Sequence, residues 1–187
     1  MSEGGQEKVE FVLSGLGGHG ILTIGLLLAQ AGLLKFRHVS WFPSYETFQR
    51  GGKVFCHVVL SQDRVLSPVV SEPDVLIVTD DYSLETNEEY VMEGGILAFD
   101  RTIVDASPKR KDIKIVDIPS TEMAKNLGST QVSNLILLGA CIGLNEFLTM
   151  NTLETGLEAM LKNNGKEKLI PLNKEALNFG YNLMKEK

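Results

Sequence analysis

Residues 9–34 read VEFVLSGLGGHGILTIGLLLAQAGLL, and the class of the fold can be inferred from them. A short run rich in Val and Phe, Val9–Leu13, leads into a glycine-rich turn, and the apolar stretch Ile21–Leu34 follows. The order predicts a strand, a tight loop and a helix, because branched and aromatic residues favour strands and the apolar stretch is long enough for a helix. A strand–loop–helix unit is typical of the beginning of an α/β domain.

The rest of the chain continues the alternation. Asp74–Thr79 is an uninterrupted apolar run, which is typical of a central strand covered on both faces. Further strands are predicted at Val39–Phe42, Lys53–Leu60, Ile96–Phe99 and Ile113–Ile118, and helices at Ser83–Met92, Ser120–Leu127, Val132–Phe147, Thr152–Asn163 and Asn173–Lys185. We expect Arg64–Leu66 to pair with Lys53–Leu60 as an antiparallel hairpin. Residues 1–187 are thus predicted to form one α/β domain, a three-layer sandwich with a mainly parallel Rossmann-like sheet, an inserted β-hairpin and a helical C-terminal region.

Composition and charge restrict the function. The net charge of −6 argues against nucleic acid as a partner, and we interpret the basic cluster Lys109–Lys111 as a solvated turn. The N-terminus is polar and acidic, unlike a signal peptide, so a cytoplasmic location is expected. No apolar run reaches the ~20 residues that a membrane span needs. The chain is therefore expected to contact neither nucleic acid nor membrane.

The two cysteines, Cys56 and Cys141, are too few for a metal site. An iron–sulfur cluster usually takes about four thiolates and structural zinc takes four Cys or His ligands, so this chain supplies neither site alone. We interpret both residues as small buried hydrophobic side chains.

Two predicted helices are apolar around most of their circumference. Neither Ile21–Leu34 nor Val132–Leu148 shows a clean polar stripe. A helix of this kind is buried on all sides, so we infer that at least one of the two packs against another chain. The alternative is a crowded layer of helices within a single chain.

The glycine loop has the pattern Gly-x-Gly-x-x-Gly, formed by Gly15, Gly17, Gly18, His19 and Gly20. A dinucleotide site of the Rossmann type also needs an acidic residue at the end of the second strand, but that strand ends in Trp-Phe-Pro-Ser. NAD is therefore disfavoured. Two interpretations remain open: a loop that binds an anion at the helix N-terminus, and a purely structural turn. His19 is the histidine placed to touch a ligand, or it is structural.

A second motif follows the second predicted strand and contains Ser44, Tyr45, Arg50, Gly51 and Gly52. An arginine before two flexible residues is suited to binding a carboxylate or a phosphate. The same pattern also fits an exposed turn. We expect this segment to lie at the carboxyl edge of the sheet, so that Arg50 faces the same crevice as the glycine loop.

The joint order of these motifs resembles the catalytic gamma domain of pyruvate and other 2-oxoacid:ferredoxin oxidoreductases. The resemblance also includes Pro-Asp-Val-Leu-Ile-Val at residues 73–78 and Asn134 followed by Leu138-Gly139-Ala140. It extends from about Val9 through the C-terminal helices. The chain departs from the family pattern at His19, where glutamine is usual, and at Glu46 and Phe48, where glycine and glutamate are usual.

The resemblance implies a gamma-type subunit of a complex that oxidatively decarboxylates a 2-oxoacid to an acyl-CoA. Thiamine diphosphate would lie on alpha and beta subunits and the iron–sulfur clusters on a ferredoxin-like subunit. This chain would have no catalytic residue of its own, with room for a coenzyme A contact at the two motifs and Asn134, and it could form a homo-oligomer in isolation. The alternative is a free-standing nucleotide- or CoA-binding module. The identity of the 2-oxoacid stays open.

Overall fold

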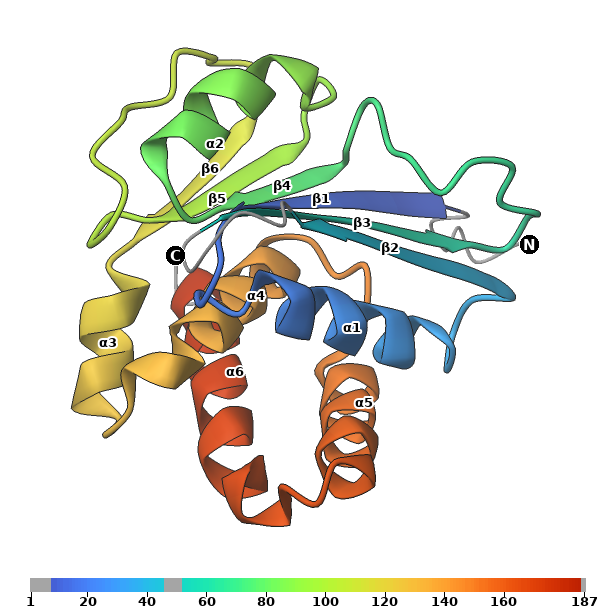
Figure 1. Cartoon of the computed structure of the whole chain (residues 1–187), viewed down its shortest axis with the longest axis vertical. Helices are drawn as coiled ribbons and strands as arrows, with labels where there is room; N and C mark the ends of the chain where they lie inside the picture. Colours follow the sequence, from blue (N-terminus) through green and yellow to red (C-terminus); the bar gives the residue numbers. More distant parts are fainter. Residues whose placement is uncertain (1–7, 46–51, 186–187) are drawn as a thin grey trace.

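The computed structural model describes residues 8–45 and 52–185, and six strands form one sheet in the order β2-β3-β1-β4-β5-β6 (Figure 1). Neighbours β1, β4, β5 and β6 run parallel to one another, whereas β3 is antiparallel to β1 and to β2. The predicted sheet, mainly parallel with an inserted antiparallel element, is therefore confirmed. The strands are β1 (Lys8–Leu16), β2 (His38–Tyr45), β3 (Lys53–Ser61), β4 (Val75–Val78), β5 (Ile96–Asp100) and β6 (Lys114–Ile118).

The partner predicted for β3 is wrong. Instead of pairing with Arg64–Leu66, β3 lies between β1 and β2, with Val58 opposite Phe11 on one side and Trp41 on the other. Pairing with two long strands satisfies far more backbone groups than pairing with three residues. Arg64–Leu66 lies outside the sheet, and Leu66 is 89% exposed.

Helices cover both faces of the sheet, in agreement with the predicted sandwich. Helices α1 and α4 cover one face with α5 and α6 behind them, whereas α2 covers part of the other (Figure 1). The helices are α1 (Ile21–Gly32), α2 (Asp81–Asn87), α3 (Ser120–Asn126), α4 (Ser133–Leu144), α5 (Met150–Asn163) and α6 (Ile170–Lys185), with single 3-10 turns at Glu88–Tyr90, Thr130–Val132 and Glu167–Leu169. Within the described residues, no helix is both long and apolar enough to cross a membrane.

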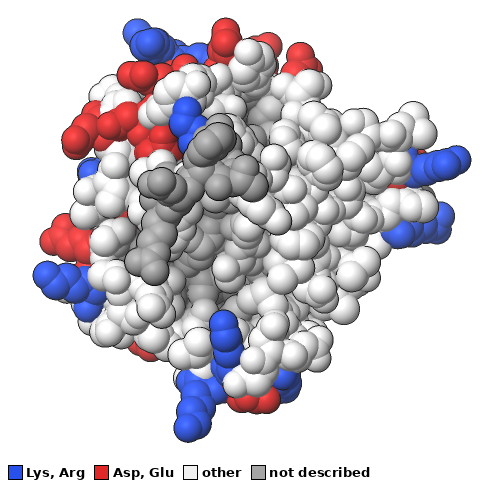
Figure 2. Space-filling model, viewed as in Figure 1, with Lys and Arg blue, Asp and Glu red and all other residues white. Residues whose placement is uncertain are grey.

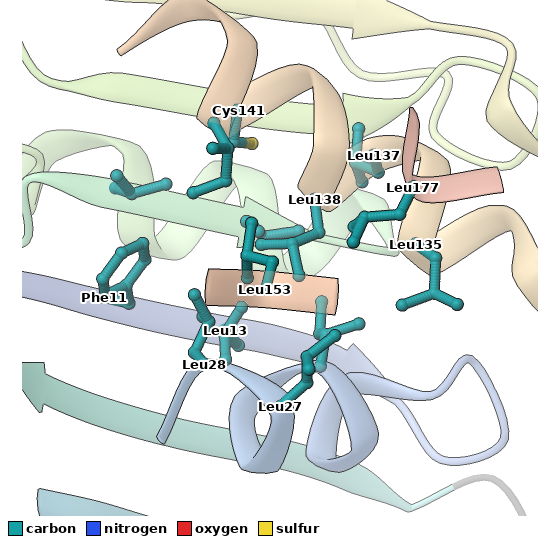
Figure 3. Packing of buried hydrophobic residues seen from close by; sticks show 14 of the residues in the cluster. Phe11, Leu13, Leu27, Leu28, Leu135, Leu137, Leu138, Cys141, Leu153 and Leu177 are labelled. Carbon is teal, nitrogen blue, oxygen red and sulfur yellow. The ribbon is translucent and has the colours of Figure 1, made fainter. Parts of the chain in front are cut away.

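The two faces of the sheet bury separate apolar clusters. Phe11 and Leu13 of β1 point toward α1 and α4, where they meet Leu28 and Leu138 (Figure 3). Val12, between them, belongs to the smaller cluster on the α2 side. This alternation follows from the two-residue period of a strand. All four residues of β4 are buried, which confirms the predicted central strand.

Helix α4 does not need another chain to cover it. Its residues from Asn134 to Gly143 are all buried within this fold, against the sheet and α6. The backbones of α4 and α6 approach closely at Gly139, Gly143 and Gly180. A Cβ atom at these positions would lie 2.1 Å from the Leu177 carbonyl oxygen, 2.5 Å from that of Tyr181 and 1.9 Å from that of Ile136, respectively. The alternative of a crowded helix layer within one chain therefore describes α4, and an interface role for it is wrong.

Helix α1 leaves the interface prediction open. Leu22 and Leu26 are only partly buried, and Leu33 and Leu34, just beyond the helix, are 61% and 58% exposed. The surface over α1 and β2 carries few charged residues, whereas acidic side chains gather near α2 (Figure 2). An apolar patch next to α1 thus remains consistent with the predicted contact.

The basic cluster is only partly a solvated turn. Lys109 and Lys111 are exposed, but the guanidinium group of Arg110 donates to the backbone carbonyls of Glu89 and Val91. The Glu88 carboxylate, 5% exposed, accepts hydrogen bonds from the backbone N–H groups of Lys109 and Arg110 at 2.6 and 2.7 Å. Arg110 and Glu88 therefore fasten this loop to the end of α2.

Candidate functional site

The glycine loop connects the carboxyl end of β1 to the first turn of α1. Gly18 and Gly20 have positive φ angles of 104° and 74°, which favour glycine over residues with a Cβ atom. The backbone N–H of Gly17 donates to the Gly52 carbonyl oxygen at 3.0 Å. Gly52 therefore lies next to the glycine loop, as the second motif requires.

Gly15 is not part of the turn, since it lies within β1 and is buried. A Cβ atom there would be 1.8 Å from Thr79 Oγ1. The absence of a side chain at this position thus makes room for the hydroxyl group of Thr79, and Gly15 acts through packing.

A crevice of about 450 Å³ opens at the carboxyl ends of the parallel strands β4 and β5. The first turn of α1, the beginning of α3 and the beginning of α4 complete its wall. Open α/β sheets bind ligands at this edge. Its lining residues are Gly18, His19, Gly20, Thr23, Thr79, Asp100, Ile103, Ser120, Thr121, Thr130, Gln131, Ser133, Asn134 and Leu137.

Asn134 ties α4 to the glycine loop. Its side-chain Nδ2 donates to the Gly20 carbonyl oxygen at 3.1 Å, and a Cβ atom at Gly20 would lie only 2.1 Å from that nitrogen. Asn134 is 8% exposed, and its Oδ1 has no hydrogen-bond partner among the described residues. The residue therefore fixes the loop and leaves a buried acceptor without a partner in the crevice wall.

Two further buried polar atoms in the crevice wall lack a partner within residues 8–45 and 52–185. They are Thr79 Oγ1 and His19 Nδ1. Thr79 follows β4 directly and is 6% exposed. Buried polar atoms are normally hydrogen-bonded, so this group of atoms marks a position where water or a ligand can supply the missing bonds.

Asp100 is the charged side chain among the described lining residues. It ends β5 and is 2% exposed. Its Oδ1 accepts from the Thr102 N–H at 2.9 Å, while Oδ2 accepts from the Thr121 N–H at 2.8 Å and the Thr121 hydroxyl at 2.5 Å. Asp100 therefore holds the first turn of α3 in place, and its oxygens are already engaged.

The second motif is only partly described. Ser44 and Tyr45 end the edge strand β2, where Tyr45 is 66% exposed, and neither residue lines the crevice. Arg50 and Gly51 lie outside the described residues. Predicted site residues that the structure brings together at the crevice are Gly18, His19, Gly20 and Asn134.

The strand order explains why a dinucleotide site does not fit. In a Rossmann site the ribose-binding carboxylate follows a strand that neighbours β1 in parallel. Here β2 is at the sheet edge, separated from β1 by the antiparallel strand β3. Even a carboxylate at the end of β2 would therefore be one strand too far from the glycine loop.

The sequence interpretation missed Thr79, Asp100 and the polar residues that begin α3 and α4. A signal was available, because Thr79 and Asp100 each stand at the end of a predicted parallel strand. Carboxyl ends of neighbouring parallel strands meet at one edge. For Thr121 and Ser133 the sequence offered no comparable signal, since their position depends on how α3 and α4 pack.

Both cysteines are fully buried, which confirms their interpretation as small hydrophobic side chains. Burial raises the pKa of the Cys56 thiol and of the Cys141 thiol to about 12. We expect the native protein at pH 8 to show no fast reaction with a thiol-specific disulfide reagent, and the protein in denaturant to react at both cysteines. Rapid modification of one thiol in the folded chain would contradict this assignment. Among the described side chains, no cluster of three or more His, Cys, Asp or Glu could hold a metal ion.

Comparison with known proteins identifies the family. The profile described as "Pyruvate ferredoxin/flavodoxin oxidoreductase" matches residues 10–183. Ketoisovalerate oxidoreductase subunit VorA of Methanothermobacter marburgensis is 37% identical over 174 residues, which are 92% of this chain but 36% of VorA. The chain thus spans about a third of that relative. The 2-oxoglutarate synthase subunit KorC of Methanocaldococcus jannaschii is 28% identical over 183 residues, 96% of this chain and 95% of KorC.

A solved structure shares the fold. It is the 2-oxoglutarate:ferredoxin oxidoreductase from Magnetococcus marinus with 2-oxoglutarate, coenzyme A and succinyl-CoA bound. The TM-score is 0.83 at 24% identity, and the match covers 97% of this chain and 32% of the other. The resemblance carried by the glycine loop and the second motif is confirmed: this chain belongs to the pyruvate ferredoxin/flavodoxin oxidoreductase family.

Proposed function

We propose that this chain is the gamma-type subunit of a 2-oxoacid:acceptor oxidoreductase. The complex would convert a 2-oxoacid and coenzyme A to an acyl-CoA by oxidative decarboxylation and pass the electrons to an iron–sulfur acceptor. The observation that carries the proposal is the family match over residues 10–183. Similarity to KorC over nearly the whole of both chains supports a separate subunit within such a complex.

Partner subunits would hold the redox-active groups. Thiamine diphosphate supplies the carbanion stabilisation that decarboxylation needs, and iron–sulfur clusters accept the electrons. Two buried cysteines of raised pKa do not fit a cluster site. We therefore assign both groups to thiamine-binding alpha and beta subunits and a ferredoxin-like subunit, in a cytoplasmic complex.

A contact with coenzyme A is the role we propose for the crevice. Its unpaired hydrogen-bonding atoms, on Thr79, His19 and Asn134, fit the amide and purine groups of that molecule. The phosphates of coenzyme A fit less well, because the described lining of the crevice has no Lys or Arg. Arg50, which lies outside the described residues, is the residue that we assign to a phosphate or to a carboxylate of a partner subunit.

Co-purification tests the proposed function most directly. The tagged chain, expressed in its native cell, should bring down a thiamine diphosphate-binding subunit and an iron–sulfur subunit. The complex should reduce a viologen with one or more of pyruvate, 2-oxoglutarate, a branched-chain 2-oxoacid and indolepyruvate, and only when coenzyme A is present. A chain that purifies without these partners would contradict the proposal and favour the free-standing nucleotide- or CoA-binding module.

Arg50 gives a prediction about this complex. Replacing Arg50 by alanine should raise the apparent KM for coenzyme A about tenfold or loosen subunit association, since a charge-assisted hydrogen bond is typically worth ~1.5–3 kcal/mol. Arg50→Lys should restore only part of the effect, because lysine lacks the planar fork. Steady-state kinetics and size-exclusion chromatography measure both quantities. The matched control is Arg37→Ala, an exposed arginine away from the crevice. Unchanged assembly and KM in Arg50→Ala would leave the motif as a solvated turn.

A further inference from the structure

We propose that the crevice binds an uncharged hydrogen-bonding group, of the carboxamide or aminopurine type, through Asn134 and Thr79, and that any phosphate of the same ligand stays outside it. The inference rests on the proposed function for the identity of the whole molecule that carries this group. The nature of the bound group itself follows from this chain's own side chains.

The orientation of the Asn134 amide is fixed. Its Nδ2 donates to the Gly20 carbonyl oxygen at 3.1 Å, and the opposite orientation would place two oxygens against each other. Oδ1 is then a buried acceptor in the crevice wall, without a partner among the described residues. An acceptor in this position requires an N–H or O–H group, which a ligand can supply in place of water.

Thr79 can supply a hydrogen-bond donor beside the acceptor of Asn134. Its hydroxyl can donate one hydrogen bond and accept others, and no described residue pairs with it. Gly15 leaves the space that this hydroxyl fills, because a Cβ atom at Gly15 would lie 1.8 Å from Thr79 Oγ1. A buried hydroxyl without an internal partner is free to pair with a ligand that reaches the crevice wall.

The charge of the crevice lining favours an uncharged group over a phosphate. Asp100 is the charged residue of the described lining, and its two oxygens already accept three hydrogen bonds. A phosphate in the crevice would meet this carboxylate without a cation among the described lining residues to balance it. An uncharged amide or purine edge meets no such penalty.

Two parts of a coenzyme A molecule share this chemistry, namely the adenine base and the pantetheine amides. Adenosine, pantetheine and inorganic phosphate are therefore the three probes, each added to the isolated full chain and to the reconstituted complex. Saturation-transfer NMR and calorimetric titration measure binding. We expect adenosine or pantetheine to bind in at least one of the two preparations and phosphate to compete with neither, and the probe that binds identifies the source.

Thr79→Val is the decisive variant because it keeps the shape of the side chain and removes only the hydroxyl group. We expect it to weaken binding of the uncharged probe about tenfold, while the Tm of the free chain stays the same or rises, since no internal hydrogen bond is lost. Thr79→Ser, which retains the hydroxyl, should bind within about threefold of the wild type. A purely structural threonine would lower Tm in Thr79→Val instead.

Asn134→Leu, which keeps the shape of the side chain and removes the acceptor, tests this part of the proposal, and Asn173→Leu is its matched control. Asn173 donates to the Leu169 carbonyl in the same way but is on α6, away from the crevice. We expect the first variant to lose binding at least tenfold and the control to change it less than twofold. Binding of phosphate alone, or probe affinity that ignores both Thr79 and Asn134, would overturn the inference. Failure to find partner subunits would contradict only the proposed function, since the probes also test the isolated chain.

Discussion

Replacing Gly180 by alanine should lower the free energy of unfolding by about 2–3 kcal/mol, as expected for an overpacked core. The added Cβ atom would lie 1.9 Å from the Ile136 carbonyl oxygen and 3.0 Å from the Ala140 nitrogen. Both are backbone atoms of α4, so relief requires α6 to move away from α4. Urea denaturation followed by circular dichroism measures the effect.

The sign of this change is informative. In an exposed helix, alanine is more favourable than glycine by ~1 kcal/mol, so helix propensity alone predicts stabilisation. The matched control is Asn182→Ala, an exposed position on the same helix, which should alter stability by less than about 0.5 kcal/mol. A Gly180→Ala chain as stable as the wild type would mean that α4 and α6 do not pack as closely as described.

The α4–α6 contact also shows where sequence interpretation was limited. The apolar circumference of α4 correctly predicted burial on all sides. It could not identify what covers the helix, because the same pattern results from a second chain or from α6. Gly139 and Gly180 lie about 40 positions apart, and only the structure shows that both lie at one helix crossing.

Strand existence was easier to predict than strand pairing. Runs such as β1 and β4 have a local signature in Val, Ile and Phe, and both were found where predicted. The partner of β3 was not predictable from proximity, because Arg64–Leu66 follows it closely in sequence whereas β1 lies some forty residues earlier. Pairing of β3 with β1 depends on many backbone groups of two distant segments, and no local residue pattern specifies it.

At the crevice, the sequence indicated the backbone but not the polar side chains. The glycine loop was found because positive φ angles leave a visible trace in glycine residues. Asn134 was found through a family resemblance, and the structure explains it by the hydrogen bond to Gly20. Thr79 and Asp100 were missed although each stands at the end of a predicted parallel strand, because that position marks a shared site only once the two strands are known to be neighbours.

Replacing Asp100 by alanine should lower the free energy of unfolding by about 3 kcal/mol. The buried carboxylate accepts three hydrogen bonds, two from Thr121 and one from Thr102, and hydrogen bonds to a charged group are worth ~1.5–3 kcal/mol each before relaxation. Without the carboxylate, the first turn of α3 loses the partner of its Thr121 N–H. Denaturant titration measures the loss in stability.

Asp100→Asn should destabilise the protein less than Asp100→Ala, because the amide oxygen can still accept from Thr121. Some loss should remain, since the NH2 group then faces a donor. The matched control is Asp117→Ala on the neighbouring strand β6. Its carboxylate pairs with Arg101 at 2.8 Å, with both side chains about half exposed, and exposed ion pairs are worth only ~0–1 kcal/mol. If Asp100→Ala were no more destabilising than Asp117→Ala, Asp100 would not anchor α3. In that case the crevice would lack a fixed wall on that side, and Ser120 and Thr121 could not hold defined positions beside a ligand.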